Sequence, residues 1–121
     1  MSQARQVLGK MGEDLACQEL QRRGYAILAR RYRCRRGELD IVARDGQTTV
    51  FVEVKTREGC EFGTGSEAVT ALKRRHMASV AQDYLVRHRL TETPCRFDVV
   101  SIDVSKAGTQ IELYQNAFDV V

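Results

Sequence analysis

Two carboxylates and a lysine have the residue types and the spacing of a metal-dependent hydrolytic site. Asp40 lies in one predicted strand, and Glu53-Val54-Lys55 lies in the next. Like charges about 4 Å apart cost on the order of 4 kcal/mol at an effective dielectric constant near 20, and a divalent cation removes that cost. Carboxylate oxygens suit Mg²⁺ or Mn²⁺, which also take water and phosphate oxygens, so the set is typical of phosphodiester hydrolysis. The alternative is a cross-strand salt bridge on a solvated face.

A β-hairpin must position these groups. Apolar residues alternate with polar ones over residues 37–55, and this period of two predicts half-buried strands. Asp45-Gly46, between the two runs, is a strong hairpin-turn signal. The apolar set is Leu39, Ile41 and Ala43 before the turn and Val50, Val52 and Val54 after it.

The register of the hairpin decides whether the carboxylates meet. A two-residue turn at Asp45-Gly46 pairs Asp40 with Phe51, which makes Asp40 and Glu53 diagonal neighbours on one face. A slip of one residue would send Asp40 to the opposite face, and the valines oppose that slip because they need the buried side.

Five arginines crowd into the seven residues 30–36, immediately before the hairpin. They are Arg30, Arg31, Arg33, Arg35 and Arg36. Like charges this close repel one another unless an anion is present, and guanidinium groups bind phosphate in a bidentate manner. We expect a patch that holds a nucleic acid by its phosphates, although a merely solvated face is the alternative. Glu38 either supports the metal site or pairs with one of these arginines.

Two helices flank the predicted strands. Helical spacing of apolar residues predicts a first helix over about residues 3–23, stopped by Gly24, and a second over about residues 66–89 with Ser66 as its N-cap. Gly9 and Gly12 each cost the first helix about 1 kcal/mol, so they allow a close approach or mark a frayed start. Two further strands are expected between residues 96 and 115.

Composition narrows the class of protein. The chain has 121 residues, a net charge of +3 and four cysteines without a CxxC pair. We expect one domain over residues 1–121, with reduced thiols, no membrane span and a cytoplasmic location. The mildly basic charge is compatible with a nucleic acid partner.

An ordered set of motifs resembles the YraN family of small bacterial proteins, regarded as nucleases and similar to archaeal Holliday-junction resolvases. Asp40 with Glu53-Val54-Lys55 is similar to the PD-(D/E)xK signature of the restriction-endonuclease-like superfamily. The matching segments are Gly12-Glu13, residues 37–42, residues 50–57, Phe62-Gly63, Val69 with Lys73, and residues 96–100. Nearly the whole chain is covered.

This resemblance implies a fold and a set of roles. The fold is a restriction-endonuclease-like α/β core, a mixed sheet of about five strands flanked by helices, in the order αβββαββ. Asp40, Glu53 and the Val54 carbonyl would hold Mg²⁺ or Mn²⁺, and Glu13 would complete the acidic cluster directly or through water. Lys55 would orient or deprotonate the attacking water, and Lys73 would contact phosphate or support the site.

Three functions remain open on these grounds. The first is a metal-dependent nuclease acting on DNA, with branched or junction DNA as a candidate substrate and a homodimer as a compatible assembly. The second is a nucleic-acid-binding module with little or no catalysis, within a DNA-processing complex. The third is a structural role, in which the acidic face is a salt-bridged surface.

Overall fold

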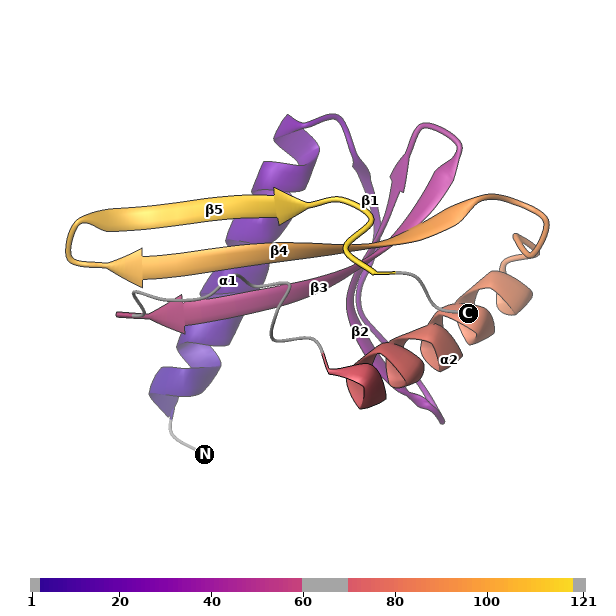
Figure 1. Cartoon of the computed structure of the whole chain (residues 1–121), viewed down its shortest axis with the longest axis horizontal. Helices are drawn as coiled ribbons and strands as arrows, with labels where there is room; N and C mark the ends of the chain where they lie inside the picture. Colours follow the sequence, from indigo (N-terminus) through magenta and orange to yellow (C-terminus); the bar gives the residue numbers. More distant parts are fainter. Residues whose placement is uncertain (1–2, 60–69, 119–121) are drawn as a thin grey trace.

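The computed structural model describes residues 3–59 and 70–118, and two helices and five strands follow one another along them (Figure 1). They are α1 (Gln3–Arg22), β1 (Ala26–Cys34), β2 (Gly37–Asp45), β3 (Thr48–Glu58), α2 (Ala71–Arg87), β4 (Cys95–Ser105) and β5 (Gly108–Tyr114). The strands form one sheet in the order β1-β2-β3-β4-β5. Only β3 and β4 are parallel, as a crossover through α2 requires. The predicted α/β class, mixed sheet and order αβββαββ are confirmed.

The ends of the helices follow local chemistry. α1 stops where predicted, because Gly24 adopts a φ of +94°, a left-handed conformation that favours glycine. α2 begins later than predicted. Its N-cap is Thr70, whose hydroxyl accepts a hydrogen bond from the Lys73 amide, whereas Ser66 lies outside the described residues.

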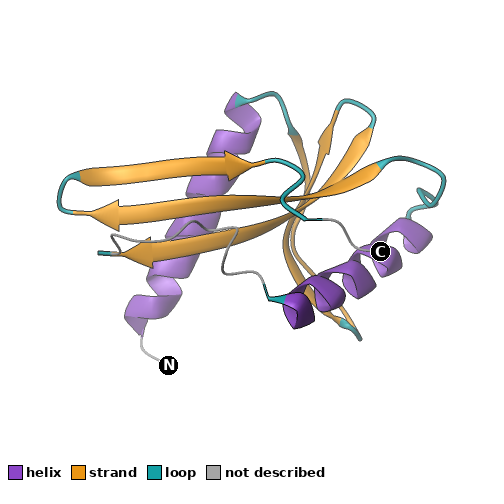
Figure 2. Cartoon of the chain, in the orientation of Figure 1, coloured by secondary structure: helices purple, strands orange, loops and turns teal. Residues whose placement is uncertain are grey.

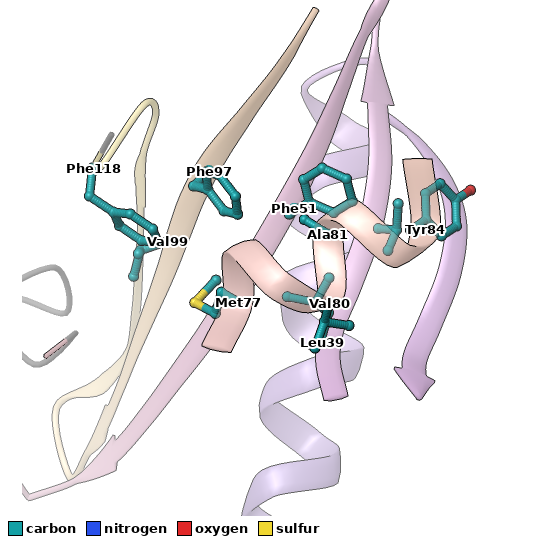
Figure 3. Packing of buried hydrophobic residues seen from close by; sticks show 10 residues of the cluster. Leu39, Phe51, Met77, Val80, Ala81, Tyr84, Phe97, Val99 and Phe118 are labelled. Atoms are coloured by element: carbon teal, nitrogen blue, oxygen red, sulfur yellow. The ribbon is translucent and has the colours of Figure 1, made fainter. Parts of the chain in front are cut away.

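The two helices cover opposite faces of the sheet, so there are two cores (Figure 2). Figure 3 shows the α2 side, where this helix packs on Leu39, Phe51 and Phe97. On the α1 side, Ala16 and Leu20 of the helix belong to a cluster with strand residues that include Ile41, Val52 and Val100. β3 serves both cores, because successive side chains of a strand point to opposite faces.

The register of the hairpin differs from the prediction. Asp45 pairs with Thr48, so the two-residue turn is Gly46-Gln47 rather than Asp45-Gly46. Phe51 faces Val42 instead of Asp40. The shift is two residues, which preserves the alternation of faces, so Val50 and Val52 are buried and Val54 is partly buried on the expected side.

β2 bends at Asp40. Leu39 belongs to the core on the α2 side and Ile41 to the core on the α1 side, although strict alternation would put both on one face. The pairing of β2 with β3 ends at Ile41 and Val52. In the pairing of β2 with β1, Ile41 and Leu39 have partners but Asp40 has none. Opposite it, Arg31 has a φ of +52°, in the sparsely populated left-handed region. Beyond this point β2 diverges from β3 (Figure 1).

One close contact fixes α1 on the sheet. A Cβ on Gly12 would lie 2.0 Å from Oγ1 and 3.0 Å from Cβ of Thr56 in β3. At Gly9, one turn earlier, a Cβ would meet nothing within 4 Å. Of the two explanations left open by the sequence, close approach therefore holds for Gly12.

These two glycines are expected to respond to alanine with opposite signs. Gly12→Ala should lower the free energy of unfolding by about 1–3 kcal/mol, because the helix must move off β3. Gly9→Ala should raise it by about 0.5–1 kcal/mol through helix propensity. Urea denaturation of both variants checks this, and Thr56→Ala should restore part of the loss in Gly12→Ala. Equal effects at the two positions would contradict the close contact.

Candidate functional site

The divergence of β2 from β3 brings the two predicted carboxylates into contact. The Asp40 and Glu53 carboxyl groups lie close enough to interact directly, and Asp40 Oδ2 accepts a hydrogen bond from the Val54 amide at 2.8 Å. The Glu53 side chain is only 7% exposed. Two neighbouring acidic groups, one buried and the other half-buried, favour a proton or a cation between them.

Burial is the main cause of a raised pKa at Asp40. The low-dielectric surroundings, together with the negative charge of Glu53, raise the pKa of Asp40 to about 7. The Val54 amide and the Lys73 ammonium act in the opposite direction but do not compensate. Near neutral pH the metal-free pair therefore holds a proton that two exposed carboxylates would release.

Two lysines surround Glu53 from different elements. Lys55 Nζ lies 3.4 Å from Glu53 Oε2, and Lys73 Nζ lies 3.5 Å from the same oxygen. Lys55 follows on the same strand and the same face, as the period of two predicts, whereas Lys73 arrives from the first turn of α2. The structure thus brings Asp40, Glu53, Lys55 and Lys73 together.

The Val54 carbonyl faces the same gap. In an extended strand the N–H and C=O of one residue point to the same side, and the Val54 N–H points to Asp40 of β2. The ladder between β2 and β3 has already ended at Val52. The carbonyl oxygen is therefore directed to the space that the bend of β2 opens.

These donors match the ligands of a hard divalent cation. Two carboxylates and a carbonyl supply only oxygen, and Mg²⁺ is commonly bound through one or two carboxylates while it keeps several waters. Over residues 3–59 and 70–118 no three His, Cys, Asp or Glu side chains lie close enough to hold a metal ion together. The fit is thus to a cation that shares its shell with water and phosphate, and not to a closed protein cage.

Glu13 lies outside this group of side chains. Its carboxylate accepts from Arg31 Nε at 3.1 Å to both oxygens, and Arg30 lies 3.7 Å away. The two arginines, Glu13 and Lys10 line a hollow of about 220 Å³ between α1 and β1. The predicted contribution of Glu13 to the acidic cluster stays a prediction.

The arginine run divides into two parts. Arg30 and Arg31 are neutralised by acids of α1, since Arg30 also pairs with Asp14 at 2.7 Å. The others surround the turn between β1 and β2, where a hollow of about 430 Å³ opens. Its lining includes Arg33, Arg35 and Arg36 with Glu38, and Glu38 pairs with Arg33 at 2.6 Å. Of the two roles left open for Glu38, pairing with an arginine is the one observed.

Sequence reasoning missed a buried network under β3. Asp98 is fully buried and accepts hydrogen bonds from Tyr25, Arg96 and the Asn116 amide. Arg96 also reaches Asp45 at the turn of the hairpin, at 2.9 Å. The partners of Asp98 come from positions as far apart as Tyr25 and Asn116, so no local pattern in the sequence indicates them.

Comparison with known proteins gives a consistent result. The model of the uncharacterised protein family UPF0102 matches residues 12–102. A UPF0102 protein of Geobacter metallireducens is 48% identical over 120 residues, covering 99% of this chain and 98% of its own length. One from Symbiobacterium thermophilum is 48% identical over 112 residues, covering 92% and 95%. Neither description names an activity. None of the described helices is long and apolar enough to span a membrane.

Proposed function

Because this chain belongs to the UPF0102 family, which is the YraN family that its motifs resemble, we propose that it is a divalent-metal-dependent nuclease. The family description supplies no activity, so the support comes from the site. The observation that carries the proposal is the contact between Asp40 and the buried Glu53 beside Lys55, where β2 and β3 separate. A solvated salt-bridge surface does not explain a buried Glu53 in contact with a half-buried Asp40 whose pKa is raised to about 7.

Each residue of the site has a part in this proposal. Asp40, Glu53 and the Val54 carbonyl would hold Mg²⁺ or Mn²⁺. When bound, the cation would supply electrostatic stabilisation of the phosphate and activation of water. Lys55, one-quarter exposed at the same gap, would orient the attacking water and stabilise negative charge on the phosphate. By resemblance, Glu13 would complete the acidic cluster, directly or through water.

The arginines support nucleic acid as the substrate. Arg33, Arg35 and Arg36 are exposed around the turn between β1 and β2, and phosphate contacts of this kind position a duplex without reading its bases. Arg30 and Arg31 would first have to leave Glu13 and Asp14. By resemblance, the proposed substrate is DNA, and branched DNA in particular. The homodimer and the cytoplasmic location are likewise proposals that rest on the resemblance.

A second function is favoured by one observation. The arginine-lined hollow at the turn between β1 and β2 is built without Asp40, Glu53 or Lys55. A nucleic-acid-binding module that lacks catalysis would need only this surface. The two functions differ in what the acidic pair does, and not in what the arginines do.

Cleavage of labelled substrates separates the two functions. The purified protein is incubated with single-stranded, duplex, flapped and four-way-junction DNA and an RNA set, in Mg²⁺, in Mn²⁺ or in chelator. Metal-dependent cutting is expected, and Asp40→Asn or Lys55→Ala should each lower its rate at least about a hundredfold. Lys106→Ala, in the exposed turn between β4 and β5, is the matched control and should cut normally.

Binding without cutting would overturn the nuclease. If the protein binds the panel in a salt-sensitive way, and Asp40→Asn and Lys55→Ala bind equally well, the binding module is correct. The arginines at the turn between β1 and β2 would then be the residues to substitute.

A further inference from the structure

Glu53 lies between two ammonium groups, which is more positive charge than one carboxylate needs. Lys55 and Lys73 both lie within 3.5 Å of Glu53 Oε2. Because the carboxylate is 7% exposed, solvent screens these interactions less than it would at the surface. A divalent cation beside Glu53 would meet both ammonium groups at close range, so at least one of them must give way.

The two lysines differ in their freedom to leave. Lys55 is in the interior of β3, where it pairs with Ser101 of β4, and its side chain is 25% exposed. Lys73 is in the first turn of α2, and its side chain is 42% exposed. The Thr70 cap holds the backbone of Lys73, but the four-carbon stem can carry the ammonium group into solvent. Lys73 is thus the lysine that can withdraw.

We propose that Lys73 takes the place of the divalent cation beside Glu53 in the metal-free protein, and that the cation displaces it toward the substrate phosphate. This inference rests on the proposed nuclease function. It makes Lys73 a positioning residue with two alternative partners, Glu53 and phosphate. The exchange keeps the buried carboxylate neutralised in both states.

The proposal has a consequence that other roles of Lys73 lack. If Lys73 competes with the cation for Glu53, it weakens cation binding, and removal of Lys73 must tighten that binding. By the same coupling, a bound cation weakens the contact between Lys73 and Glu53. A lysine that only contacts phosphate would leave the affinity for a free cation unchanged. A lysine that only supports the fold would weaken cation binding when it is lost.

The test is calorimetric titration of Mn²⁺ into the full chain without nucleic acid. Lys73→Gln is expected to bind Mn²⁺ at least about fivefold more tightly than the unmodified protein. Lys73→Arg keeps the charge and should bind like the unmodified protein. Arg75→Gln removes an equal charge from an exposed position in the same region of α2 and should change the affinity less than about twofold.

Three results would overturn the proposal. The first is an unchanged or weaker Mn²⁺ affinity in Lys73→Gln. The second is equal tightening in Arg75→Gln, which would indicate an effect of net charge. The third is tightening in Lys73→Arg. Asp40→Asn, titrated in parallel, separates this failure from failure of the metal site. If Asp40→Asn abolishes binding while Lys73→Gln does not tighten it, only the role of Lys73 is wrong. If no protein binds Mn²⁺, both proposals are wrong.

Discussion

Asp40→Asn is expected to stabilise the metal-free protein at pH 7 and above, by as much as about 4 kcal/mol. Burial and the charge of Glu53 raise the pKa of Asp40 to about 7 from an ordinary value of 3.8. The folded protein therefore prefers the neutral acid. Asparagine imitates that acid, because its amide can donate to Glu53 and its oxygen can accept from the Val54 amide.

The sign of the pH dependence follows from the raised pKa. Below about pH 4 both the folded and the unfolded chain hold the proton, and Asp40 costs nothing. Between about pH 4 and pH 7 the unfolded chain releases the proton while the folded chain keeps it, so the free energy of unfolding falls as pH rises. Above pH 7 the full cost is present.

Denaturation in urea at a series of pH values, with chelator, measures this. The unmodified protein should lose stability from pH 4 to pH 7, and Asp40→Asn should lose less. Asp83→Asn is the control, because Tyr32 and Arg87 lower the pKa of that carboxylate, so its contribution is lost toward low pH instead. If Asp40→Asn follows the pH dependence of the unmodified protein, Asp40 does not hold a proton at neutral pH.

Asp98→Ala is expected to lower the free energy of unfolding by about 3–5 kcal/mol, the typical cost of removing one partner of a buried ion pair. Asp98 is fully buried, and its oxygens accept from Tyr25, the Asn116 amide and Arg96, which is 20% exposed. Without the carboxylate, the buried Tyr25 hydroxyl and the Arg96 guanidinium lose their buried acceptor. The total free energy of unfolding of a domain of this size is about 5–15 kcal/mol, so the expected loss is a large part of the stability.

Urea denaturation of Asp98→Ala, Arg96→Ala and the double variant checks the network. The double variant should cost less than the sum of the two single variants, because both act on one pair. Asp103→Ala, on the same strand, is the control and should change stability by less than about 1 kcal/mol. A loss below that value in Asp98→Ala would show that the network contributes little. Mn²⁺ binding by Asp98→Ala should match the unmodified protein wherever it is folded.

The hairpin shows how far periodicity reaches. The alternation of apolar residues placed Asp40, Glu53 and Lys55 on one face, so their approach was predictable, although it placed Leu39 on the wrong face. The register was not, because a shift of two residues satisfies the same alternation. In the observed register, with Asp45 opposite Thr48, Asp45 accepts a hydrogen bond from Arg96, which lies 51 residues away in the sequence.

The partners of charged residues that meet across different elements could not be predicted from local pattern. Glu13 was grouped with the acidic pair and the arginines with phosphate, whereas Glu13 and Arg31 contact each other in the structure. The predicted grouping and the observed contact are both consistent with the sequence. Periodicity alone gives neither the placement of the helices nor the bend at Asp40. The position of Lys73 beside Glu53 likewise depends on how α2 docks.

The order of the strands in the sheet also bears on how the molecule folds. Every strand pairs with its neighbour in sequence, and three of the four pairings are antiparallel steps through short turns, which close quickly. Only the parallel pairing of β3 with β4 must wait for the long crossover that contains α2. The acidic pair belongs to the early hairpin, and Lys73 belongs to the crossover. The hairpin can close locally, but its bond to Arg96 and its second lysine both depend on elements that follow Glu58, so the complete site requires the crossover.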